Sequence, residues 1–144
     1  MSFTIPMLIA LLLSAAFIAL AALHVAWGLG FTWGGDSLLP QQPDGTLLFK
    51  PGAVACFAAA LMFALPALIY LMRVGILVTG VPDWVPYVGV WGVAAVLLVR
   101  AVGEFRYAGL TKKIKGTSFA RRDTRIYTPL CLVLAALGVT LQVL

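Results

Sequence analysis

The first apolar run of this chain constrains its fold more than any other feature. No charged side chain occurs before Asp36, and the run from Phe3 to Leu29 exceeds the ~20 residues that a helix needs to cross the hydrocarbon core of a bilayer. The whole chain has the same character, with 62% hydrophobic and 10% charged residues, against roughly 45 to 50% and about 25% in ordinary soluble domains. A soluble globule and a disordered chain are therefore excluded.

The first run is interpreted as a membrane span and not as a secretory signal. Ala19-Leu20-Ala21 resembles a cleavage box. However, the basic segment that precedes the apolar part of a signal peptide is missing, and the apolar run is too long.

Three further runs of spanning length follow. We place the four spans at about residues 3–29, 52–73, 84–107 and 126–144, within a single membrane domain covering residues 1–144. A segment that crosses lipid must satisfy its backbone hydrogen bonds internally, which favours helices. The sequence therefore predicts an all-α fold, an integral membrane four-helix bundle.

The positive charge is concentrated before the fourth span. Seven basic residues stand there against Asp123, whereas the rest of this +5 chain sums to −1. The seven are Arg106, Lys112, Lys113, Lys115, Arg121, Arg122 and Arg125. With four spans, the first and third loops share one side, so the positive-inside rule places them in the cytoplasm and both termini outside. We expect Lys112, Lys113, Lys115, Arg121 and Arg122 to meet anionic lipid headgroups, and we expect no nucleic-acid partner.

Five polar or aromatic residues form a candidate ligand-binding site at the same side. Arg100 and Glu104 lie four residues apart, on one face of the expected third helix together with Tyr107. His24 and Trp27 reach nearly the same depth on the first helix, by helical rise. Charges within a span tend to face the bundle interior. We therefore expect a pocket in which Glu104 orients Arg100 and His24 donates hydrogen bonds or shuttles a proton.

Structural alternatives stand beside this site. Arg100 can extend toward the headgroups, and His24 with Trp27 can belong to an interfacial aromatic belt. Asp123 and Tyr127 open the fourth span either as a cap or as part of the polar cluster. Cys56 and Cys131 lack ligand spacing, and His24 is the single histidine, so neither a metal site nor a cofactor is predicted.

Three classes of function remain open at this stage. The first is a ligand or lipid-headgroup pocket near the cytoplasmic leaflet. The second is a structural or interaction protein whose basic loop docks on lipid or on a partner. The third is a transporter or channel subunit acting as a homo-oligomer, because four spans enclose little lumen. No nucleophile elbow or dinucleotide fingerprint assigns an enzymatic reaction.

Several motifs resemble one family of short bacterial membrane proteins, the domain of unknown function DUF3995. They are RAVGEFRYAG at residues 100–109, KIKGT at 113–117 and YTPLC at 127–131, together with His24, Trp27-Gly28 and Trp33-Gly34. The resemblance covers nearly the whole chain. It implies a four-helix protein of the bacterial inner membrane and implies no activity.

Overall fold

The structure is a computed structural model that describes residues 4–144, with only the backbone of residues 35 and 36. Its long helices are α1 (Ile5–Gly28), α2 (Ala53–Arg73), α3 (Trp84–Val102) and α5 (Thr128–Val143). The short elements are the 3-10 helix η1 (Gly35–Leu38), α4 (Ser118–Arg122) and the π-helical turn η2 (Asp123–Tyr127). Within the described residues the β pairing is limited to an isolated bridge between Gln41 and Leu47. The predicted all-α class is confirmed.

Four helical segments are long and apolar enough to cross a membrane: α1, α2, α3 and the continuous segment Ser118–Val143, which joins α4, η2 and α5. Only 22 to 28% of the residues in their apolar windows are buried inside the protein. Most of the apolar surface therefore has no protein covering and requires lipid. The prediction of four apolar helices of spanning length is confirmed, and their ends differ from the expected ones.

Two of the predicted ends are wrong, and one lies outside the described residues. The third helix stops at Val102 and not at residue 107, because Gly103 has φ +88° and ψ 178°, a conformation that is open essentially to glycine alone. The fourth helical segment begins at Ser118 and not at residue 126, where the Thr117 hydroxyl accepts a hydrogen bond from the amide of Ala120 at 3.1 Å. Residue 3, the expected start of the first span, is not among the described residues.

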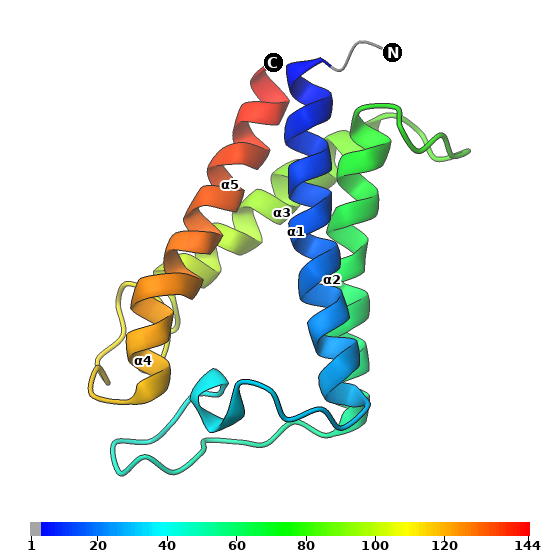
Figure 1. The fold of residues 1–144 in the computed structure, drawn as a ribbon. Helices are drawn as coiled ribbons and strands as arrows, with labels where there is room; N and C mark the ends of the chain where they lie inside the picture. The colour runs from blue at the N-terminus through cyan, green and yellow to red at the C-terminus, as the bar shows by residue number, and fades with distance from the viewer. Residues whose placement is uncertain (1–3) are drawn as a thin grey trace.

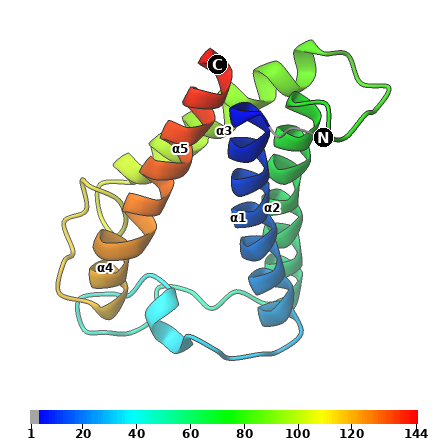
Figure 2. The ribbon, with the colours of Figure 1, turned by 45° about the horizontal axis from the view of Figure 1, so that its top comes forward.

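The helices pack as two pairs, α1 with α2 and α3 with α5. The start of α1 and the end of α5 lie at one end of the bundle, and residues 29–52 and 103–117 connect the helices at the other (Figure 1). Both views show the two pairs diverging toward this loop end (Figure 2). The alternation of directions places the first and third loops on one side, as the sequence predicts.

The apolar core lies toward the end that carries the termini. Each long helix contributes to it, with Leu13 and Phe17 from α1, Tyr70 from α2, Val90 from α3 and Leu141 from α5. A buried hydrogen bond from the Ser14 hydroxyl to the carbonyl of Ala67, 3.0 Å long, joins α1 to α2. This core cluster does not include residues of the loop end.

Candidate functional site

An ion cluster around a buried carboxylate connects α3, the following loop and η2 at the loop end. The carboxylate of Asp123 is 0% exposed and accepts from the Arg100 guanidinium at 2.7 Å and from the Lys112 ammonium at 2.8 Å. It also accepts from the backbone amide of Gly109 at 2.8 Å and from the Thr128 hydroxyl at 3.3 Å. Two cations and two neutral donors therefore compensate the burial of one carboxylate, as a buried charge requires.

The π-helical turn explains how Asp123 and Thr128 meet. They are five residues apart, which in a regular α-helix places side chains on different faces. A π-helix pairs residues i and i+5, and here the Thr128 hydroxyl donates to the Asp123 carboxylate across that spacing. The turn thus directs both side chains to the interior of the cluster.

The loop after α3 is closed on itself by Glu104. Its carboxylate accepts from the amides of Arg106 at 3.0 Å and Ala108 at 2.9 Å, and also from the amide of Tyr107. The backbones of Gly103 and Gly109 approach so closely that a Cβ on Gly103 would lie 1.9 Å from the carbonyl oxygen of Ala108. This closure brings the Gly109 amide to Asp123.

The expected pairing of Arg100 with Glu104 is wrong. Because α3 ends at Val102, Glu104 and Tyr107 are not on the helical face that carries Arg100. Glu104 binds backbone amides of its own loop, and Arg100 binds Asp123. The guanidinium carbon of Arg106 instead lies over the Tyr107 ring, 5.2 Å from the centre of that ring. Asp123 was expected either to cap the fourth helix or to join the polar cluster, and its contacts support the second interpretation.

His24 and Trp27 lie in the other helix pair. The His24 Nδ1 atom is 2.8 Å from the carbonyl oxygen of Leu20. The centre of the imidazole ring lies 4.9 Å from the ring centre of Trp27 and 4.8 Å from that of Phe63 in α2. The Trp27 indole donates to the carbonyl of Trp33 at 3.0 Å. In the described part of the chain, no hydrogen bond or ring contact joins these two residues to Arg100, Glu104 or Tyr107. The aromatic-belt alternative for this pair stays a prediction.

The predicted headgroup residues divide into one buried and four exposed cations. The side chain of Lys112 is 5% exposed and bonds Asp123 and the carbonyl of Gly109, so the expectation that it meets headgroups is wrong. Lys113, Lys115, Arg121 and Arg122 are exposed. Arg125, which our expected headgroup set omitted, is exposed beside them. Arg125 follows Arg121 by four residues, so the two share one face of the helix. This spacing is the sequence signal that would have added Arg125 to the expected headgroup residues.

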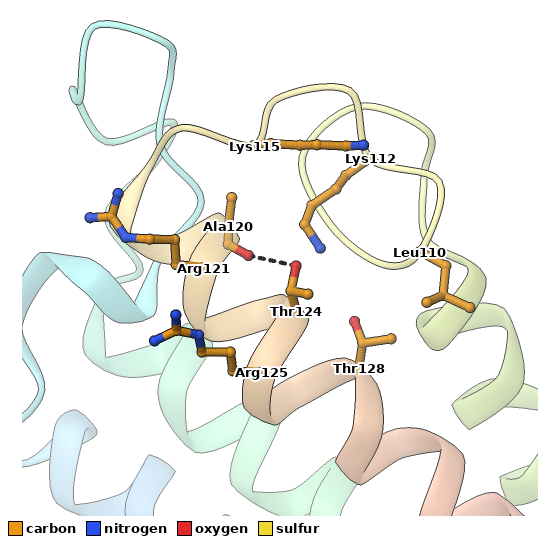
Figure 3. A pocket seen from close by; sticks show the side chains of 8 residues that line it. All are labelled: Leu110, Lys112, Lys115, Ala120, Arg121, Thr124, Arg125 and Thr128. Carbon is orange, nitrogen blue, oxygen red and sulfur yellow. Dashed lines mark hydrogen bonds between the residues drawn. The ribbon is translucent and has the colours of Figure 1, made fainter.

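Two hollows flank these cations. The first has a volume of about 310 Å³ and is lined by Leu110, Lys112, Lys115, Ala120, Arg121, Thr124, Arg125 and Thr128. The second, about 350 Å³, is lined by Ser37, Ser118, Arg121, Arg122, Arg125 and Ile126. Figure 3 shows Arg121 and Arg125 projecting to one side of the helix, with Lys112, Lys115 and Leu110 on the other side of Thr124 and Thr128. The two arginines therefore form a ridge, and each lines both hollows.

Within residues 4–144, no group of three or more His, Cys, Asp or Glu side chains is arranged to hold a metal ion. Cys56 is buried and Cys131 half-buried, and both are free thiols.

The fold and the comparisons define what kind of protein this is. Its four apolar helical segments make it a multi-pass membrane protein. The sequence profile of a protein family of unknown function, DUF3995, matches residues 17–138, and the chain belongs to this family. No curated protein and no solved structure matches the chain significantly.

Proposed function

We propose that this protein resides in the bacterial cytoplasmic membrane with its loop end in the cytoplasm and both termini outside. The supporting observation is the placement of charge. Apart from Arg73, every basic side chain belongs to the segments Lys50 and Arg100–Arg125, and the fold gathers these segments at one end (Figure 1). The positive-inside rule assigns that end to the cytoplasm.

The proposed function is to bind anionic phospholipid headgroups of the cytoplasmic leaflet, as an interaction protein of that membrane surface. The exposed cations and the two hollows beside them carry this proposal. Arg121, Arg122 and Arg125 lie at the loop end of the apolar segment Ser118–Val143, and Lys113 and Lys115 lie in the connection just before it. The proposal assigns the headgroup contacts to Lys115, Arg121, Arg122 and Arg125, which line the two hollows.

Lipid retention tests this proposal. The purified protein is reconstituted in mixed phosphatidylcholine and phosphatidylglycerol bilayers and re-extracted, and the retained lipids are quantified at low and high salt. We expect phosphatidylglycerol to be enriched at low salt and the enrichment to fade with salt. Each cation contributes roughly 1 kcal/mol near an anionic surface, so Arg121→Gln with Arg125→Gln should weaken retention by about 30-fold. Equal retention of the two lipids at low salt would contradict the proposal.

A further inference from the structure

Arg121 and Arg125 stand between two hollows and line both of them. From this we propose that the two hollows together take one phospholipid that carries two phosphate groups on a short linker, with one phosphate on each side of the arginine ridge. This inference rests on the proposed function, because it names the class of headgroup that the same cations recognise.

Each hollow adds one exposed cation of its own to the shared pair. Lys115 belongs to the first hollow and Arg122 to the second. Lys112 also lines the first hollow, but its ammonium is already bound to Asp123 and to the carbonyl of Gly109. The threonines of the first hollow are similarly occupied, since Thr124 donates to the carbonyl of Ala120 and Thr128 to Asp123. The donors that remain for phosphate are therefore the exposed cations.

The arginine ridge is partly fixed before any ligand arrives. The Arg121 guanidinium donates to the carbonyl of Gly116 at 3.2 Å and to the Ser118 hydroxyl at 3.3 Å. These contacts hold its charge between the two hollows and leave further N–H groups for phosphate, since a guanidinium has five. Arg125 makes no hydrogen bond or ion pair with any side chain or backbone group that the structure describes, a set that leaves out the side chain of residue 36. It can therefore turn its planar fork toward either phosphate.

Charge matching favours two linked phosphates over one. A lipid with a single phosphate in either hollow leaves the cation of the other hollow, Lys115 or Arg122, without an anion. A lipid with two phosphates engages both hollows in one binding event, because the second contact becomes intramolecular. Binding at such a site is stoichiometric and saturable, unlike a diffuse attraction to the surface.

The test compares cardiolipin, which has two phosphates joined by a glycerol, with phosphatidylglycerol, which has one. The protein is reconstituted in phosphatidylcholine vesicles that also hold both anionic lipids at equal total negative charge, and retained lipids are counted by native mass spectrometry. We expect one retained cardiolipin per protomer and at least a tenfold enrichment of cardiolipin over phosphatidylglycerol. Arg125→Gln should reduce this enrichment at least fivefold, with the thermal unfolding temperature unchanged because the side chain is exposed.

Lys113→Gln is the matched control, because it removes one exposed cation that lines neither hollow. It should leave the cardiolipin preference intact. Equal enrichment of the two lipids per charge, or equal losses in the two variants, would overturn the two-phosphate site while leaving the headgroup proposal standing. If neither anionic lipid is enriched over phosphatidylcholine, both proposals fail.

Discussion

Asp123→Asn is expected to lower the free energy of unfolding by about 3 to 5 kcal/mol, the range for breaking a buried ion pair. The substitution keeps the side-chain shape but removes the charge that Arg100 and Lys112 bind at 2.7 and 2.8 Å. The Lys112 side chain, 5% exposed, would lose its anionic partner and keep only the carbonyl of Gly109. Unfolding of the purified protein in detergent, followed by intrinsic tryptophan fluorescence, measures this change.

Glu104→Gln provides the control for this result. Glu104 is exposed and binds three backbone amides but no cation among the described residues. We expect a loss of about 1 kcal/mol, and a double-mutant cycle with Arg100→Leu should show no coupling. The corresponding cycle of Arg100→Leu with Asp123→Leu should show coupling well above that baseline. Strong coupling of Arg100 to Glu104 and none to Asp123 would contradict the assignment of the ion cluster.

The second large effect is expected for Gly103→Ala. The added Cβ would lie 1.9 Å from the carbonyl oxygen of Ala108, and the residue would have to keep φ +88°. The backbone strain costs about 1 to 3 kcal/mol, and relief of the clash costs about the same again. Because the loop that moves also carries the Gly109 amide, the contact of that amide with Asp123 should weaken too. The same fluorescence measurement reports the loss of stability.

Substitutions at two other glycines separate the effect of backbone strain from the effect of the steric clash. Gly45 has φ +87°, and an added Cβ there would have nothing within 4 Å, whereas Gly116 has open space without a positive φ. Gly45→Ala should therefore show strain alone, and Gly116→Ala should be close to neutral. If Gly103→Ala destabilises no more than Gly45→Ala, the close packing of the loop after α3 is wrong.

The four spans could be predicted because a bilayer demands long apolar helices, and this demand is visible in a single sequence. Helix ends within polar segments were harder to predict from the sequence. Arg100 to Tyr107 has a pattern compatible with helix, and the break at Gly103 depends on its contact with Ala108 and Gly109. The closure of that loop is a tertiary contact, which no local preference reveals.

The candidate site was also predictable from the sequence only in part. Sequence spacing alone favours Glu104 as the partner of Arg100, because a helix brings residues four apart together. The actual partner is Asp123, 23 positions further along the chain. The sequence does contain a signal for it, since Asp123 is the single acidic residue among the clustered cations. The π-helical turn that aligns it with Thr128 has no comparable signal.

The expected depth of His24 in the membrane did not identify its neighbours, for a related reason. Helical rise places a residue along the membrane normal but does not say which helices adjoin. His24 packs on Phe63 within the pair α1 and α2, whereas Arg100 belongs to the pair α3 and α5. The pairs diverge at the loop end (Figure 2), so two residues at similar depth contact different neighbours.

The central claim is that the basic loop end faces the cytoplasmic leaflet, and single-cysteine labelling tests it most directly. Cys56→Ala with Cys131→Ala removes the two native thiols. Lys113→Cys then marks the loop end, and Gly80→Cys marks the connection between α2 and α3 at the opposite end, where both positions are exposed. A membrane-impermeant maleimide should label Gly80→Cys in spheroplasts and Lys113→Cys only in inverted membrane vesicles. Labelling of Lys113→Cys in spheroplasts, with Gly80→Cys protected, would contradict the account.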